Sequence, residues 1–163
     1  MVAAAGLAVF ATSCSATHAT NVVAIKPTTN SGLCKLVSPS VVATALNTSM
    51  TFPETLVHNS TTECVYRSKQ GTNAAVLIRY DIEASGSTFA RTELDFERRG
   101  LKLGPITQLG DEAYYFSEPA GGAIVTTVVV RTGSRQLLIT GAGTLDQIGS
   151  IARYTLSQYE TTH

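Results

Sequence analysis

The sequence has little charge, no basic excess and no long hydrophobic run, and each of these absences excludes a class of protein. Charged residues make up only 15% of the 163 residues, and 12 basic side chains are balanced by 12 acidic ones. Without a basic excess to neutralise phosphates, we expect no nucleic-acid partner. No apolar run approaches the roughly 20 residues that a membrane-spanning helix needs. Hydrophobic residues still make up 44% of the chain, which is enough for the core of one domain.

Cysteine and histidine are also scarce, and their spacing does not match the common metal-site motifs. The three cysteines contain no C-x-x-C pair, and the three histidines are scattered along the chain. Two of these histidines, His18 and His163, lie close to the ends of the sequence. The sequence therefore predicts no metal site.

The N-terminal residues combine a short apolar run with a cysteine. The run Val2–Ala11 has the length of the hydrophobic region of a secretory signal, and two small residues separate it from Cys14. This arrangement resembles the bacterial lipoprotein cleavage box, in which the peptide is cut before the cysteine and the thiol is then diacylated. Two acyl chains suffice for stable membrane anchoring. We therefore expect a signal peptide at residues 1–13, lipidation of Cys14, and a flexible polar tether at residues 14–31.

Two features of this leader depart from the lipoprotein pattern. Ala11 stands where the cleavage box usually has leucine, and no Lys or Arg precedes the apolar run. We expect for this reason that natural translation starts upstream of the printed sequence. Two alternatives stay open: an ordinary secretion signal cleaved near Ala16 or Ala19, and an apolar terminus with no role in export.

The remaining cysteines, Cys34 and Cys64, allow two interpretations. If the chain is exported, an oxidising compartment favours a disulfide between them. A bridge that closes a loop of this length would stabilise the fold by roughly 3–4 kcal/mol in the chain-entropy model. If the chain stays in the cytosol, the two residues are buried free thiols.

Residues 32–163 are predicted to form a single domain of the α+β class. The hydrophobic patterns and caps indicate helices over 38–46, 87–99 and 144–159, and strands over 63–68, 74–83, 106–109, 113–117, 123–131 and 135–140. The segment 47–62 is interpreted as a polar connection. Joined by hairpins, these strands predict an antiparallel sheet of five to six strands covered on one face by about three helices. Two passes of a helix followed by strands suggest a weak internal duplication.

The segment TGAGTLD, residues 140–146, is similar to the start of a dinucleotide-binding fingerprint, but its context disagrees. The third glycine of the fingerprint is replaced by Asp146, whose carboxylate would repel a phosphate at the helix N-terminus. A capping box formed by Thr144 and Gln147 explains the same residues as the start of a helix. The sequence therefore predicts no cofactor.

Catalytic groups are equally difficult to assemble from the sequence. His58 is the one histidine that could serve as a base in the domain, and it lies in a polar segment without an obvious partner. Asp111 and Glu112 are adjacent, so we expect their side chains to point to opposite faces of a strand and not to share a site. We therefore predict no catalytic residue.

Several segments together resemble the small actinobacterial, chiefly mycobacterial, envelope lipoproteins that form families of unknown function. They are Cys34–Pro39 with the helix after it, Cys64–Tyr66 on a strand, Leu109–Tyr114 before a strand, and the final amphipathic helix. The resemblance covers residues 32–160. It implies an exported α+β domain with a Cys34–Cys64 bridge, and it implies no particular activity.

These observations predict an exported protein that is lipid-anchored at the outer face of the cytoplasmic membrane, or secreted. It would act without catalysis, by binding an envelope protein, a wall component or a small apolar ligand. We expect a ligand site between the sheet and the helices, near Tyr80 or Tyr115. The alternative is a secreted hydrolase with a site built from loops around His58, and a third interpretation is a purely structural or sensory domain.

Overall fold

The computed structural model describes residues 32–70 and 75–160. The predicted signal peptide, the predicted lipidation site Cys14 and the predicted tether lie outside these residues. Within the described ranges, no helix combines the length and the apolar character that crossing a membrane requires.

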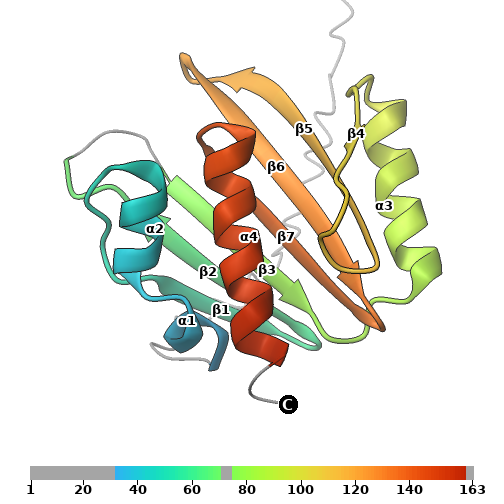
Figure 1. Cartoon of the computed structure of the whole chain (residues 1–163), viewed down its shortest axis with the longest axis horizontal. Coiled ribbons are helices and arrows are strands. Elements are labelled where there is room, and N and C mark those ends of the chain that lie inside the picture. Colours follow the sequence, from blue (N-terminus) through green and yellow to red (C-terminus); the bar gives the residue numbers. More distant parts are fainter. Residues whose placement is uncertain (1–31, 71–74, 161–163) are drawn as a thin grey trace, which may run out of the picture.

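The described residues form one antiparallel sheet of seven strands and four helices, which confirms the predicted α+β class (Figure 1). The sheet is larger than the five to six strands expected from sequence. Its strands are β1 Glu54–His58, β2 Thr61–Arg67, β3 Ala75–Asp81, β4 Gly104–Pro105, β5 Glu112–Ala120, β6 Ala123–Thr132 and β7 Arg135–Ala142. The helices are α1 Gly32–Leu36, α2 Pro39–Leu46, α3 Gly86–Arg98 and α4 Leu145–Glu160.

The sheet consists of two meanders joined along their last strands. Its order is β1-β2-β3-β7-β6-β5-β4, so β3 of the first meander pairs with β7 of the second. Ile78 lies opposite Ile139 in this antiparallel pairing. The segment with α3 and β4–β6 therefore separates two strands that are neighbours in the sheet.

The larger core lies between one face of the sheet and the helices α1, α2 and α4. In Figure 1, α4 crosses the sheet over β6 and β7, and α2 and α1 lie beside it on the same side. The sheet contributes Cys64, Tyr66, Val76, Ile78, Tyr80, Val128, Val130, Leu137 and Ile139 to this core. Ile148 and Ile151 of α4 are fully buried against them, as the predicted apolar stripe of this helix requires.

The opposite face of the sheet is covered by α3. Phe89 of α3 packs with Tyr114 and Val129 in a second, smaller cluster, and Phe96 and Leu103 lie against its edge. Successive residues of a strand point to opposite faces, and β6 is apolar on both, so Val128 and Val129 need a cover on each side. The expectation that the helices cover one face is therefore wrong.

This arrangement also bears on the suggested duplication. A helix followed by a meander does occur twice along the chain, as the sequence indicated. However, α2 contributes to the larger core and α3 to the smaller one on the opposite face. The two halves therefore share an element order without sharing an arrangement in space.

Several local predictions are confirmed and others are corrected. Thr144 and Gln147 form the predicted capping box: the Gln147 amide donates to Thr144 Oγ1 at 3.3 Å, and the Thr144 amide donates to Gln147 Oε1 at 2.9 Å. The segment predicted as a polar connection contains β1, an edge strand with one buried residue, Thr55. The short strand β4 lies at residues 104–105 and not at 106–109. Ser38 precedes α2, but its side chain makes no capping bond.

Candidate functional site

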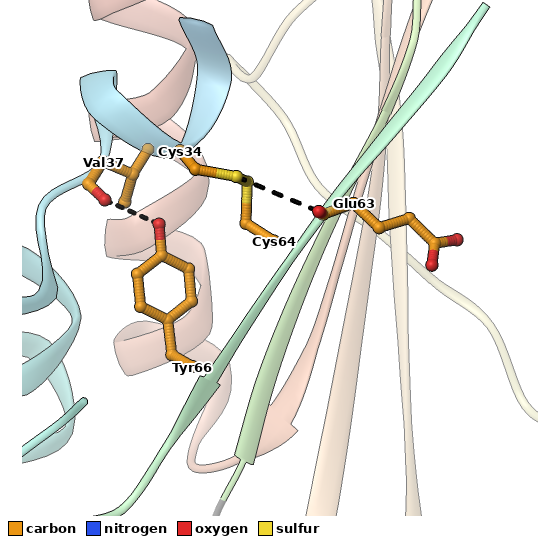
Figure 2. Close-up of a disulfide and its surroundings, with 5 residues drawn as sticks. All are labelled: Cys34, Val37, Glu63, Cys64 and Tyr66. Atoms are coloured by element: carbon orange, nitrogen blue, oxygen red, sulfur yellow. Dashed lines mark hydrogen bonds between the residues drawn. A yellow bond between two sulfur atoms is a disulfide. The ribbon is translucent and has the colours of Figure 1, made fainter. Parts of the chain in front are cut away.

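Cys34 and Cys64 form a disulfide, which confirms the pairing that the resemblance implied. Their Cα atoms are 5.7 Å apart, and both side chains are buried. The bridge joins α1 to β2, as Figure 2 shows, and the Cys34 sulfur also lies 3.9 Å from the Glu63 carbonyl oxygen. Because the two residues are 30 positions apart, the bridge closes a long loop of the unfolded chain.

A buried hydrogen bond from the same face of β2 holds the residue that directly follows this helix. The Tyr66 hydroxyl donates to the carbonyl oxygen of Val37 at 2.6 Å (Figure 2). Tyr66 and Val37 are completely buried, and burial raises the pKa of the Tyr66 phenol, which therefore stays protonated as a donor. The disulfide and this bond together attach the first helix of the domain to the sheet.

A hollow lies between α3 and the strands β4, β5 and β6. It has a volume of about 610 Å³. Phe89, Glu93 and Glu97 line it from the helix, and Tyr114 and Arg131 line it from the sheet. We call this hollow the α3 cleft.

Strand register explains the sheet side of the α3 cleft. Glu112 pairs with Arg131 and Tyr114 pairs with Val129, so all four side chains project from the face that α3 covers. Pro105 of β4 lies opposite Tyr114 and extends the same wall.

Helix spacing explains the other side. Phe89, Glu93 and Glu97 recur every four residues and therefore occupy one side of α3. The aromatic ring of Phe89 closes one end of the contact with the sheet, 5.2 Å from the Tyr114 ring centroid. Glu93 and Glu97 occupy positions at which an amphipathic helix would carry apolar residues. The helix and the sheet therefore do not pack tightly against each other at these two positions.

Arg131 is held by two carboxylates on the rim of the α3 cleft. Its Nε donates to Glu112 Oε2 at 2.7 Å, and its Nη1 lies 3.4 Å from Asp111 Oδ2. The Asp111 carboxylate also accepts the Gly133 amide at 2.7 Å. The hydrogen bond that Arg131 donates to Glu112 is the main reason that the pKa of Arg131 is raised. The positive charge of this rim is therefore already paired.

This arrangement corrects the expectation that Asp111 and Glu112 cannot share a site. Both carboxylates reach the Arg131 guanidinium. Strand alternation does not separate them, because β5 begins only at Glu112 and Asp111 still belongs to the turn before it. Gly110, with φ 63°, directs that turn toward the backbone of β6, where Asp111 donates its amide to the Arg131 carbonyl.

Glu93 and Glu97 have no such partner. Within residues 32–70 and 75–160, neither carboxylate makes a hydrogen bond or an ion pair, although Asp95 on the same helix pairs with Arg98 at 3.4 Å. The α3 cleft therefore carries two unpaired negative charges beside an arginine that is already engaged.

A residue lining the α3 cleft carries a buried polar atom that has no partner among the described residues. Tyr114 is only 3% exposed, and its hydroxyl makes no hydrogen bond to any residue that the structure describes. Burial, followed by the nearby Glu93 carboxylate, raises the pKa of this phenol. Buried polar groups are nearly always satisfied, so an orphaned hydroxyl at the wall of a cleft is an unusual feature.

The two glutamates are functional candidates that the sequence pattern left unrecognised. Of the large apolar residues of α3, Phe89 is buried and Phe96 packs at the edge of the smaller cluster, whereas Leu94 is 49% exposed and contributes little to the core. One sequence signal could have identified the two glutamates. They interrupt the apolar stripe of the helix at positions 93 and 97, on the same side as Phe89.

The predicted ligand residues Tyr80 and Tyr115 lie on the other face of the sheet. Tyr80 is 3% exposed and stacks on Tyr159 of α4, with the ring centroids 4.1 Å apart. Burial raises the pKa of its phenol, and the nearby Arg135 partly offsets this effect. Tyr115 packs at the edge of the larger core, where Gly104 sits so close that any side chain there would meet the ring. Their role in ligand binding stays a prediction.

His58 lies at the end of β1 and not in a loop. Its side chain is exposed and faces a small hollow of about 160 Å³ that Glu63 and Arg79 also line. Its ring makes no hydrogen bond or ion pair with the described residues. Among the residues that the structure describes, no serine or aspartate hydrogen-bonds this histidine.

No protein-family model, curated protein or solved structure matches this chain. These comparisons therefore add no functional information to the geometry of the residues that the structure describes. Among those residues, no three metal-ligating side chains lie together.

Proposed function

We propose that this chain is an exported protein of the cell envelope, anchored to the membrane by lipidation at Cys14, with a non-catalytic binding role. The Cys34–Cys64 bridge is the observation that carries the proposal. Disulfides persist in oxidising compartments and are rare in the cytosol, so a buried structural bridge supports export. The resemblance to actinobacterial envelope lipoproteins points in the same direction.

The position of the bridge suits a tethered domain. Residues 14–31, the proposed tether, lead directly into α1, and Cys34 fastens α1 to β2 near the middle of the first meander. A force applied to the tether would be transmitted to the sheet through the disulfide and through the Tyr66 hydrogen bond. The five-residue helix α1 would therefore not detach from the sheet on its own.

The α3 cleft supports binding more than catalysis. Its lining within the described residues contains no Ser, Cys or His that could act as a nucleophile or its base. It does combine apolar walls with a few convergent polar groups, which is the usual composition of a small-molecule site.

The anchor can be tested by cell fractionation. The full chain and its Cys14→Ala variant would be produced in an actinobacterial host and partitioned in Triton X-114, with Ser15→Ala as a control that leaves the thiol in place. We expect the wild type and Ser15→Ala in the detergent phase and Cys14→Ala outside it. Recovery of all three proteins from the cytosol would overturn the proposal. Release of all three into the medium would show that the chain is exported and would overturn the proposed lipid anchor.

A further inference from the structure

We propose that the α3 cleft binds an organic cation, namely an ammonium or guanidinium group carried on a short apolar stem. This inference deepens the proposed binding role and rests on it. Three independent features of the α3 cleft point to the same chemistry: its unpaired charge, its orphaned hydroxyl and its apolar wall.

The unpaired charge comes from Glu93 and Glu97. Like charges four residues apart on a helix repel each other, and these two have no cation among the described residues to offset the repulsion. The same helix does pair Asp95 with Arg98, so cations are available to α3 but lie on its other side. A bound cation would relieve the repulsion.

The orphaned hydroxyl belongs to Tyr114. An ammonium group has three N–H donors and seeks three acceptors. Glu93, Glu97 and the Tyr114 oxygen can supply them, because all three residues line the α3 cleft and the Glu93 carboxylate acts on the Tyr114 phenol. Tyr114 is only 3% exposed, and its hydroxyl oxygen is buried and has no partner in the described chain.

The apolar wall accounts for the stem. Phe89, Leu103 and Pro105 line the α3 cleft beside the polar groups. An alkyl chain would bury against them, whereas a hydrated metal ion would leave this surface without a role. Arg131 and its two carboxylate partners, Glu112 and Asp111, would offer polar groups on the rim to the other end of a larger ligand.

Calorimetric titration of the purified full chain tests this inference. The probes are pentylammonium, its neutral analogue 1-pentanol, and the peptide acetyl-Gly-Lys-Gly-amide, which presents the same group as a protein side chain. We expect pentylammonium to bind at least about tenfold more tightly than 1-pentanol, since a charge-assisted hydrogen bond is lost in the alcohol. If the peptide binds as tightly as pentylammonium, the natural cation is a side chain of a partner protein. If pentylammonium binds and the peptide does not, the natural ligand is a free amine.

Variants locate the binding. Glu93→Gln with Glu97→Gln is expected to weaken pentylammonium binding at least about tenfold, whereas Asp95→Asn on the same helix should leave it unchanged. The inference would be overturned if 1-pentanol bound as tightly as pentylammonium, or if neither cationic probe bound. It would also be overturned if the double variant bound pentylammonium as tightly as the wild type. Displacement of pentylammonium by calcium chloride, added at the same concentration of positive charge, would overturn it as well. The titration does not depend on export. A negative titration result would therefore overturn only the cation site, and a negative fractionation result only the proposed export and anchoring.

Discussion

Two residues, Cys34 and Cys64, carry the strongest covalent constraint in the described chain. The bridge joins two residues that are 30 positions apart and thereby removes conformational freedom from the loop between them in the unfolded state. We predict that reduction lowers the free energy of unfolding by about 3–4 kcal/mol. Urea denaturation of the wild type with and without dithiothreitol measures this difference.

The variant that lacks both cysteines provides the control for this experiment. Cys34→Ala combined with Cys64→Ala should unfold at the same urea concentration whether or not reductant is present. A wild type whose transition does not move on reduction would contradict the structural role of the bridge.

Tyr66 and Tyr114 make a matched pair of buried phenols. The Tyr66 hydroxyl donates to Val37, whereas the Tyr114 hydroxyl has no partner in the described residues. Tyr66→Phe should lower the free energy of unfolding by about 1–2 kcal/mol, because a buried carbonyl loses its donor. Tyr114→Phe should leave stability unchanged or raise it, because it removes a polar atom that is buried without compensation.

Thermal unfolding followed by circular dichroism compares the two variants directly. Equal losses would show that the Tyr114 hydroxyl does have a partner, and the α3 cleft would lose its orphaned group. A Tyr114→Phe variant that is stable but binds pentylammonium more weakly would separate function from folding at this residue.

At the scale of elements, the helix starts differ in how firmly they are capped. Thr144 accepts a hydrogen bond from the Gln147 amide at the start of α4, whereas the Ser38 side chain, before α2, hydrogen-bonds Ser40 instead. Thr144→Ala should therefore lower the free energy of unfolding by about 1 kcal/mol. Ser38→Ala should change it by less than about 0.5 kcal/mol.

The same denaturation series measures both variants, because each is an exposed or half-exposed position that alters no core contact. A Ser38→Ala variant that loses as much stability as Thr144→Ala would show that the α2 start is capped after all.

The elements that the sequence predicted well are those with local signals. The capping box at 144–147 marks the start of α4, and Gly133-Ser134 marks the turn between β6 and β7. The helix α1 has five residues, too few to show a period, and its burial depends on the disulfide. The strand β1 pairs on one side only and carries polar residues, so its composition resembles a connection.

Local sequence signals predict only a part of the α3 cleft. The pairing of Glu112 with Arg131 follows from a tight turn at Gly121-Gly122, because a hairpin fixes the register of its strands. The placement of Glu93 over this pair does not follow, since it depends on α3 crossing to the second face of the sheet. That crossing is a consequence of the whole arrangement of strands.

At the scale of the molecule, the two faces of the sheet differ in what they do. The face under α4 and the disulfide holds the larger core and gives the domain its stability. The face under α3 has the smaller core and leaves room for the α3 cleft. We therefore expect the proposed binding in the α3 cleft to require little rearrangement of the larger core.

Export is the claim on which this account depends, and mass spectrometry of the protein isolated from its own cells tests it most directly. Free thiols are first blocked with iodoacetamide, and the protein is then digested without reduction. The account predicts a linked peptide pair containing Cys34 and Cys64, and a chain that begins at a diacylated Cys14. An intact leader with both Cys34 and Cys64 alkylated would contradict it.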